Sequence, residues 1–404
     1  MRQMPGGTGC LPINGGIRKV KIRLLMAAVL TLPATAYAQN CEFKIGAMGP
    51  MSGGGAQWGL SMKSAAELAA AEANQQGGVK IDGKTCRVSV VSYDSKYTPD
   101  GAAAGANALA GDDIHFIIGP VGSVENAAVK PVAARNQQLA WNAAYANNAE
   151  EPKFPLMFQV SPPPAIWADL VIKRAMKTFP IKSVVILVPN DQTGTDVAAV
   201  DAKAYEQNGV KATTEFYQRG TTNFAPIITR ALASSPDAVD TASSAPGDAG
   251  VIVKQLRLAG FTGPVGRVGG PGTAEILRVS GGLDVLKDFY WYEAVPTDDP
   301  KVQAIDDEFR KLVGRDPVGG TTFWSYLPGA RMTMKAIQTA GTGDAVKVAA
   351  VLRAMPVEDP NIGKGYWTGK KYYGIAQTLF FPFGIGIIKD GKNLGVERQE
   401  AQPE

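Results

Sequence analysis

Short apolar runs rich in β-branched residues alternate with amphipathic stretches along almost the whole chain. This order is typical of repeated βα units, in which parallel strands form a sheet whose faces are covered by helices. Helices are indicated where small or apolar residues recur every three or four positions, as at Ser64, Leu68 and Ala71. In the first part of the chain the predicted elements alternate strictly, with strands at 43–48, 87–93, 114–118 and 139–142 and helices at 59–76, 99–110 and 123–137.

A second set of βα units begins after the helix-breaking segment Pro162-Pro163-Pro164. Strands are predicted at 183–188, 211–217, 238–240 and 289–294, with a Gly-rich strand and loop at 264–273. Helices are predicted at 165–178, 194–208, 223–233, 247–259, 300–313, 320–340 and 344–354, and the tail is strand-like at 365–368 and 383–389. The later helices are too few for a third domain. The sequence therefore predicts an α/β fold with two lobes, each a parallel sheet flanked by helices.

The chain contains a single histidine in 404 residues, His115. Zinc sites built from several histidines are therefore excluded, and a Ser-His-Asp relay would have to use this residue. His115 lies inside a predicted strand with no nucleophile motif nearby, so we expect a structural role for it. The sequence also lacks a nucleophile elbow. These observations predict a protein that is not an enzyme and that holds no metal or cofactor.

The N-terminal segment carries the excess of positive charge. The whole chain has a formal charge of +4, which taken alone indicates an anionic partner. Residues 1–38 contain five basic residues and no acid; removing them takes Lys+Arg from 41 to 36 against 37 Asp+Glu, a formal charge of −1. The remainder is therefore nearly neutral, and we expect no nucleic-acid partner.

The same segment has the order of an export signal. A basic run at 18–23 precedes an apolar stretch at 24–32, and Ala36-Tyr37-Ala38 forms a small-residue cleavage site before Gln39. The apolar stretch is far shorter than the ~20 residues of a membrane span. A buried N-terminal helix is the alternative, but it would leave Pro33 and the cleavage-site pattern unexplained. We expect an exported chain that begins near residue 39 and, since no lipobox precedes Cys41, carries no lipid anchor.

Export changes the interpretation of the cysteines. Cys10 lies in the export segment, which leaves Cys41 and Cys86 in the exported chain. Two cysteines in an oxidising compartment are more often paired than free. Each stands just before a strand-like run, and neighbouring parallel strands would bring both to one edge of the sheet. The sequence therefore predicts a Cys41–Cys86 disulfide.

One motif match is misleading. Residues 78–85 fit the phosphate-binding pattern G-x-x-x-x-G-K-[ST]. A phosphate-binding loop needs a strand before it and a helix after it, so that backbone N–H groups meet the phosphate. Here a predicted helix precedes the segment and a predicted strand follows. We interpret it as a turn.

Three loops lie at the carboxyl ends of predicted strands, the edge at which open α/β sheets bind ligands. They are the Gly-rich segment 49–59 with Trp58, the segment 119–124 with Ser123, and the segment 141–145 with Tyr145. Each has a structural alternative, since Trp58 could belong to the core and Ser123 could simply cap a helix. Together the three loops predict a single ligand site.

At these loops the sequence resembles the leucine/isoleucine/valine-binding protein family, the type I periplasmic solute receptors of ABC importers. The resemblance covers nearly all of the chain after residue 39 and is carried by KIGAMGPMSGGGAQWG (44–59), NQQGGV (74–79), VVSYDSKYTP (90–99), FIIGPVGSVENAAVKPVA (116–133) and NFAPIITRA (223–231). It implies two α/β lobes joined by three hinge crossovers that close on a ligand. The expected lobes are 39–158 plus 292–362 and 159–291 plus 363–404.

The resemblance also implies a set of ligand-binding residues: Trp58, Gly122, Ser123, Ala143, Tyr145, Thr193, Ser244 and Tyr326. Trp58 would pack on the ligand, and Ser123 with the N–H groups around Gly122 would hold its carboxylate. Tyr145 stands where the family usually has threonine.

One departure from the family bears on the ligand. Amino-acid binders of the family place an acid in a second-lobe loop, where it neutralises the ligand's ammonium; here that loop, at 269–273, has glycine at the expected site. Asp191 and Glu275 are the candidates to replace it. If neither acid replaces it, the ligand is expected to lack an ammonium group, because burying an ammonium without a carboxylate partner is costly. Aromatic residues expected near the cleft would then suit an aromatic or phenylpropanoid acid: Trp58, Trp141, Tyr145, Trp324 and Tyr326.

The sequence thus predicts a monomeric periplasmic receptor that captures a small carboxylate and delivers it to the membrane permease of an ABC importer. A branched-chain amino acid or an amide is the alternative ligand. A ligand-sensing domain of the same fold is the alternative role.

Overall fold

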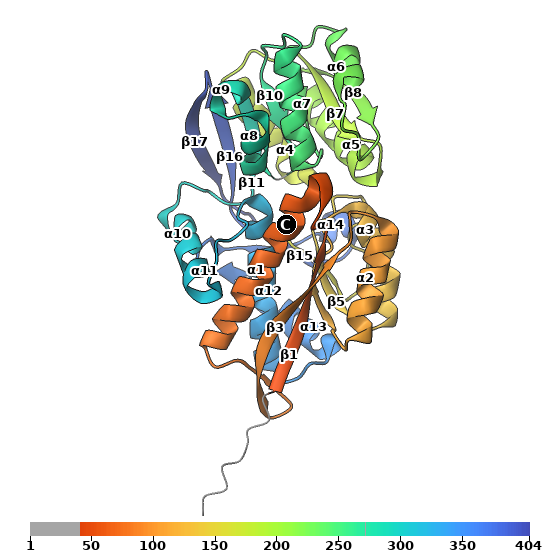
Figure 1. Cartoon of the computed structure of the whole chain (residues 1–404), viewed down its shortest axis with the longest axis vertical. Coiled ribbons are helices and arrows are strands. Elements are labelled where there is room, and N and C mark those ends of the chain that lie inside the picture. The colour runs from red at the N-terminus through yellow and green to blue at the C-terminus, as the bar shows by residue number, and fades with distance from the viewer. Residues whose placement is uncertain (1–40, 271) are drawn as a thin grey trace, which may run out of the picture. The chain divides into compact units, whose positions relative to one another are not determined.

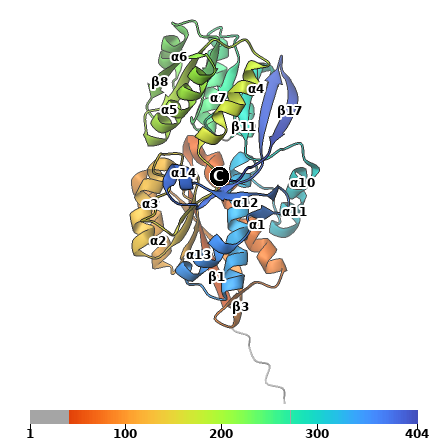
Figure 2. The same cartoon turned by 180° about the vertical axis from the view of Figure 1, so that it is seen from behind.

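The computed structural model describes residues 41–270 and 272–404 of the chain. The predicted export signal at 1–38, with its cleavage site, lies outside the described residues. Two β-sheets, each flanked by helices, organise the rest (Figures 1 and 2). Within the described residues, no helix combines the length and the apolar character needed to cross a membrane.

The first sheet has eight strands in the order β14-β15-β6-β5-β4-β1-β3-β2. Its members are β1 (Cys41–Gly49), β2 (Val79–Ile81), β3 (Lys84–Asp94), β4 (Phe116–Ile118), β5 (Leu139–Asn142), β6 (Met157–Gln159), β14 (Tyr366–Thr368) and β15 (Thr378–Phe380). Pairing is parallel from β3 through to β15, and the edge strands β2 and β14 are antiparallel to their neighbours. The central strands are continuous apolar runs because both faces of the sheet are covered.

Helices cover both faces of this sheet. One face packs against α1 (Ala56–Gln75), α12 (Thr321–Ala340) and α13 (Ala345–Ala354), and the other against α2 (Pro99–Gly111) and α3 (Ser123–Arg135). α1 and α12 lie side by side although they are far apart in the sequence (Figure 1). The small residues of α1 recur every three or four positions and are buried, which lets it pack closely against the sheet and α12.

The second sheet has seven strands in the order β17-β16-β11-β10-β9-β7-β8. They are β7 (Ser183–Pro189), β8 (Lys211–Tyr217), β9 (Ala238–Asp240), β10 (Val265–Arg267), β11 (Phe289–Glu293), β16 (Phe383–Lys389) and β17 (Lys392–Gln399). Pairing is parallel from β8 to β11, and β16 and β17 extend the sheet antiparallel. The flanking helices are α4 (Ala168–Met176), α5 (Gln192–Gln207), α6 (Ala225–Leu232), α7 (Pro246–Leu258), α8 (Thr273–Ser280) and α9 (Leu283–Leu286).

The remaining elements are short, apart from α11. They are η1 (Gly53–Gly55), η2 (Pro164–Ile166), α10 (Pro300–Gln303), α11 (Ile305–Val313), α14 (Lys370–Tyr373) and the small β12–β13 pair (Glu358–Asp359 and Gly363–Lys364). The helix expected at 300–313 is therefore two helices, divided at Ala304.

The chain passes between the two sheets three times: after β6, after β11, and between β15 and β16. The two-lobed α/β fold with three crossovers is thus confirmed. Strands β14 and β15, which the expected boundaries assign to the second lobe, are hydrogen-bonded in the first sheet. The reason is a parallel pairing of Thr378 with Gln159 across the end of β6, which the local sequence does not reveal.

The predicted disulfide is confirmed. Cys41 and Cys86 are direct partners in the parallel register of β1 and β3, and their Cα atoms lie 4.3 Å apart. Cross-strand neighbours at this separation are within the range that a disulfide can bridge.

The segment that mimics a phosphate-binding loop is part of a β-hairpin. β2 and β3 are joined at Asp82-Gly83, and both residues have positive φ, at +48° and +81°. Two consecutive positive φ values are characteristic of the tight hairpin turns in which Asp-Gly is preferred. The interpretation of residues 78–85 as a turn is therefore confirmed.

Candidate functional site

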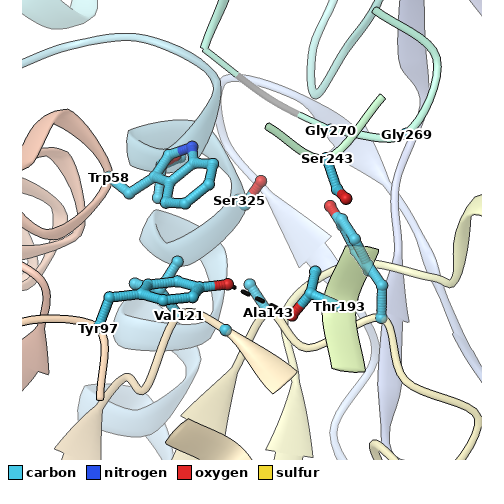
Figure 3. A pocket seen from close by; sticks show the side chains of 12 residues that line it. Trp58, Tyr97, Val121, Ala143, Thr193, Ser243, Gly269, Gly270 and Ser325 are labelled. Atoms are coloured by element: carbon cyan, nitrogen blue, oxygen red, sulfur yellow. Dashed lines mark hydrogen bonds between the residues drawn. The ribbon is translucent and has the colours of Figure 1, made fainter. Parts of the chain in front are cut away.

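A pocket lies at the carboxyl ends of strands from both sheets and contains about 440 Å³ of space, part of it open to solvent (Figure 3). Its position follows the general rule for open α/β sheets. The first lobe supplies Trp58, Tyr97, Val121, Gly122, Ala143 and Tyr145, the second supplies Thr193, Ser243, Gly269 and Gly270, and the first two turns of α12 supply Thr322 and Ser325.

Two aromatic rings that contact each other line the pocket. The ring centroids of Trp58 and Tyr97 are 5.7 Å apart, with an angle of 37° between the planes, and Figure 3 shows both rings bordering the same space. Behind Tyr97, the Arg219 guanidinium lies 4.3 Å from the ring centroid. The site therefore has a flat apolar part that suits a planar or branched hydrocarbon group.

Hydrogen bonds link the two lobes at the pocket. The hydroxyl of Thr193, at the start of α5, shares a 3.3 Å hydrogen bond with the Tyr97 hydroxyl and accepts from the Ser123 N–H at 3.2 Å (Figure 3). Thr193 belongs to the second lobe, and its two partners belong to the first. These hydrogen bonds join the two lobes. One of them uses the Ser123 N–H, which the sequence analysis assigned to the ligand's carboxylate.

The N-terminus of α3 is already occupied by groups of the protein. Glu125 accepts hydrogen bonds from the N–H groups of Val121 and Gly122, at 3.2 and 2.9 Å. Burial raises the pKa of Glu125 to about 7. The Ser123 hydroxyl accepts from the N–H of Tyr145 at 3.1 Å and from that of the next residue at 3.0 Å. The expected carboxylate clamp is thus engaged in internal contacts.

Two other predicted ligand-binding residues lie behind the pocket wall. The Ser244 hydroxyl donates to the Leu187 carbonyl at 3.0 Å, and the Tyr326 hydroxyl donates to the Pro120 carbonyl at 2.6 Å. Both side chains are fully buried and position loops that border the site.

The structure thus divides the predicted site residues into two groups. Those that line the pocket are Trp58, Gly122, Ala143, Tyr145 and Thr193. Those that lie behind it are Ser123, Ser244 and Tyr326. Their roles toward a ligand stay predictions.

Two of the aromatic residues expected near the cleft have other places. Trp141 is buried in the core of the first lobe, where its indole N–H donates to Thr333 at 2.8 Å. Trp324 borders a separate crevice, next to Tyr292 and Phe381. Only Trp58 and Tyr145 of the expected set reach the pocket itself.

Sequence reasoning missed several lining residues, among them Tyr97, Ser243, Thr322 and Ser325. Tyr97 had a recognisable signal, because it closely follows a strand that ends at the same sheet edge as the three predicted loops. Ser243 precedes the serine that was chosen, and nothing local shows which of the two faces the pocket.

Neither candidate for the missing acid is available to a ligand. Asp191 pairs with Arg219 and caps α5 by accepting from the Gly194 N–H at 2.9 Å. Glu275 pairs with Arg278 on the surface of α8. Among the described residues that line the pocket, none has a charged side chain.

A buried cation lies directly behind the glycine wall. A Cβ added at Gly270 would be 3.3 Å from Nη2 of Arg267, and one added at Gly269 would be 2.7 Å from Oδ2 of Asp201. Burial lowers the pKa of Arg267 to about 10, so the guanidinium stays charged at neutral pH. Asp201 and Asp240 are buried near it, and burial raises the pKa of both carboxyls.

The comparisons with known proteins agree with this architecture. The sequence pattern of a family described as "periplasmic binding protein" matches residues 42–380. The "Leucine-, isoleucine-, valine-, threonine-, and alanine-binding protein" of Pseudomonas aeruginosa is 26% identical over 356 residues, which cover 86% of this chain and 91% of that protein.

Two solved structures are similar in fold. A branched-chain amino acid transporter substrate-binding protein from Streptococcus pneumoniae, in complex with isoleucine, has a TM-score of 0.73 at 20% identity and covers 89% of this chain and 99% of its own. An ABC transporter solute-binding protein from R. palustris, in complex with benzoate, has a TM-score of 0.72 at 18% identity, with 89% and 97% covered.

The family pattern spans most of the described chain, and the relative from P. aeruginosa aligns over nearly its whole length. The predicted resemblance is therefore confirmed. The chain belongs to the periplasmic binding proteins of the leucine/isoleucine/valine-binding type, and it is a binding protein rather than an enzyme.

Proposed function

We propose that the protein is the periplasmic substrate-binding component of an ABC importer and that its ligand is a small carboxylate without an ammonium group, such as an aromatic acid. The observation that carries this proposal is the absence of a charged side chain among the described pocket-lining residues. An α-ammonium buried there would lose its hydration without gaining a carboxylate partner, which costs several kcal/mol.

The electrostatics behind the wall support the same ligand class. Arg267 lies close to the backbone of Gly270, in the loop at 269–273 where amino-acid binders of the family are expected to carry an acid. The Asp201 carboxyl lies behind Gly269, but burial raises the pKa of Asp201 and of Asp240, which favours their neutral forms, whereas the Arg267 guanidinium stays charged. A charged guanidinium beside neutral carboxyls disfavours a second cation in the pocket.

The relatives leave both ligand classes open for the family as a whole. The name of the P. aeruginosa protein refers to amino acids, and the two similar structures hold isoleucine and benzoate. All of these ligands carry a carboxylate. The amino acids also carry an ammonium group and benzoate does not, so the test has to measure the effect of the ammonium alone.

Transport would follow from a shift in the population of lobe arrangements. A ligand that contacts Trp58 and Tyr97 on one lobe and Ser243 on the other stabilises the closed arrangement, which a membrane permease would recognise. We take the lobes to divide as the sheets do, with residues 366–380 in the first lobe. The monomeric state and the periplasmic location belong to the same proposal.

The decisive experiment compares ligands that differ only in the ammonium. The purified protein is freed of ligand by unfolding and refolding, then titrated by calorimetry and thermal shift with leucine, 4-methylpentanoate (leucine without its ammonium), benzoate and benzamide. A ligand at 100 times its Kd stabilises the folded state by about 2.7 kcal/mol. We expect benzoate or 4-methylpentanoate to bind more tightly than leucine, and benzamide to bind weakly.

Tighter binding of leucine than of 4-methylpentanoate would overturn the proposed ligand class and favour a branched-chain amino acid binder. Absence of binding by all four compounds would contradict the class as well. Calorimetry of an unrefolded sample serves as the control, because a ligand retained from the cells would lower the apparent number of sites.

A further inference from the structure

Tyr97 lines the pocket and is also held by two groups of the second lobe. It belongs to the first lobe, between β3 and α2, and its ring borders the pocket beside Trp58 (Figure 3). Its hydroxyl shares a 3.3 Å hydrogen bond with the hydroxyl of Thr193 in α5. The guanidinium of Arg219, which follows β8, lies 4.3 Å from the ring centroid. One side chain of the first lobe therefore contacts both the ligand space and the second lobe.

Asp191 positions both of these second-lobe groups. One oxygen of its carboxylate pairs with Arg219, and the other accepts from the Gly194 N–H at 2.9 Å, which caps α5. Thr193 is the second residue of α5, so the same cap fixes its place. The side chains of Asp191 and Arg219 are 14% and 19% exposed, so water screens this ion pair less than it screens a pair on the open surface. The second lobe thus presents Thr193 and Arg219 to Tyr97 as one unit.

The backbone of the first lobe is shaped to present the Tyr97 side chain. Lys96 and Tyr97 have φ values of +55° and +57°, a conformation that is costly for residues other than glycine. Gly122 leaves room for the hydroxyl, because a Cβ at that position would lie 2.2 Å from it. Burial raises the pKa of Tyr97 to about 12, so at neutral pH the ring is an uncharged phenol that can stack with the Arg219 cation. The turn and the glycine together place Tyr97 where the second lobe contacts it.

Two other contacts between the lobes lie outside the pocket lining. The Asn147 N–H of the first lobe donates to Asp196 of α5 at 3.1 Å. Gly54 lies beside Asp248 of α7, where an added Cβ would be 2.7 Å from a carboxylate oxygen. These four residues do not line the pocket. They can stabilise closed lobes but do not touch the ligand space, whereas Tyr97 does both.

We infer that Tyr97 is a positioning residue for closure of the lobes, held across the pocket by Thr193 and Arg219. These three residues and Asp191 form what we call the closure latch. Because the latch consists of protein groups alone, it populates the closed arrangement even without a ligand. A ligand that packs on the Tyr97 ring favours the ring position that the latch requires, and it therefore shifts the population further toward closed lobes. The latch acts in this way whichever class of ligand binds.

The distance between the lobes in the ligand-free protein tests the inference. Spin labels are attached to Ala108→Cys in α2 and Lys203→Cys in α5, two exposed positions, and the distance between them is measured by double electron–electron resonance. With Cys10→Ser and an intact Cys41–Cys86 disulfide, only the introduced cysteines are labelled. The refolded protein without ligand should show a closed population. This measurement uses no ligand, so its outcome is independent of the proposed ligand class.

Variants of the latch should open the lobes. Tyr97→Phe removes the hydrogen bond to Thr193, and Arg219→Gln removes the cation from the ring. Each should lower the ratio of closed to open molecules by about 3-fold or more, the effect expected from the loss of one hydrogen bond or one cation–π contact. Arg219→Lys keeps a cation and should restore part of the ratio. Arg230→Gln is the matched control, because Arg230 pairs with Glu215 of its own lobe, and it should leave the ratio unchanged.

Three results would overturn the inference. The first is a ligand-free protein without a closed population. The second is a ratio that changes in neither Tyr97→Phe nor Arg219→Gln, whether the lobes are mostly open or mostly closed. The third is an equal fall in Arg230→Gln, which would show an effect of charge in general. If Arg219→Gln fails to fold, Tyr97→Phe decides alone, because it keeps the ring and removes only the hydroxyl.

Discussion

Replacing Ser123 with alanine separates a structural role of this residue from a ligand-binding one. Ser123 is 2% exposed, and its hydroxyl accepts hydrogen bonds from two consecutive backbone N–H groups, those of Tyr145 at 3.1 Å and Ala146 at 3.0 Å. In Ser123→Ala both N–H groups lose their acceptor inside the protein. A buried donor without a partner costs about 1–3 kcal/mol. We therefore expect the free energy of unfolding to fall by about 2–4 kcal/mol.

The assay is urea denaturation of the ligand-free protein, followed by tryptophan fluorescence and by circular dichroism. Both signals should report the same lowered midpoint in the variant. Ser325→Ala provides the control, because the Thr321 carbonyl that loses the serine hydroxyl keeps its hydrogen bond within α12. Its midpoint should lie within about 0.5 kcal/mol of the wild type.

The result that would refute this reasoning is a Ser123→Ala variant with unchanged stability and strongly reduced affinity for the ligand. That combination would mean that the hydroxyl is free to bind the ligand, as the resemblance to the family implies. If both properties are reduced, a crystal structure of the protein soaked in acetate would show directly whether a carboxylate binds at Ser123.

Three further predictions concern other parts of the molecule. Burial raises the pKa of Glu150 to about 8, so the native state keeps a proton that the unfolded chain releases. The free energy of unfolding should therefore fall as the pH rises from about 5 to 8, by up to about 1.4 kcal/mol per pH unit. Glu150→Gln should flatten this slope in urea denaturation. Reducing the Cys41–Cys86 disulfide, which joins residues 45 apart, should lower the free energy of unfolding by about 2–4 kcal/mol, as measured with and without reductant. Gly122→Ala should destabilise the protein by about 1–3 kcal/mol in the same assay, because the new Cβ would lie 2.2 Å from the Tyr97 hydroxyl.

The sequence predicts the central strands well because burial on both faces makes each of them a short apolar run. Strands β9 and β16 have the bounds that the sequence predicts, 238–240 and 383–389. The edge strand β17 was missed because its residues are mostly exposed and polar, so no apolar pattern marks it. β15 was missed for a different reason, since its place depends on pairing with β6, more than 200 residues earlier in the chain.

Two of the missed lining residues lie at unusual backbone turns, and Tyr97 is one of them although a strand ends only three residues before it. Tyr97 has φ of +57° and Ala242 has φ of +37°, left-handed values that neither residue type favours. The turn at Ala242 decides that Ser243 borders the pocket while Ser244 bonds to the Leu187 carbonyl. No local pattern distinguishes two adjacent serines in such a loop.

The difference in capping between α3 and α12, however, was available from the sequence. In α3 the third helical residue is Glu125, and an acid at that position reaches back to the N–H groups at the start of its own helix. In α12 the corresponding residue is Phe323, which has no such acceptor, and the N-cap is glycine. The N–H groups of Val121 and Gly122 are therefore satisfied by a side chain of α3 itself, whereas α12 supplies no side-chain acceptor for the N–H groups of its first turn. Capping by a helix's own residues is thus a local feature that the sequence predicts without knowledge of the tertiary contacts.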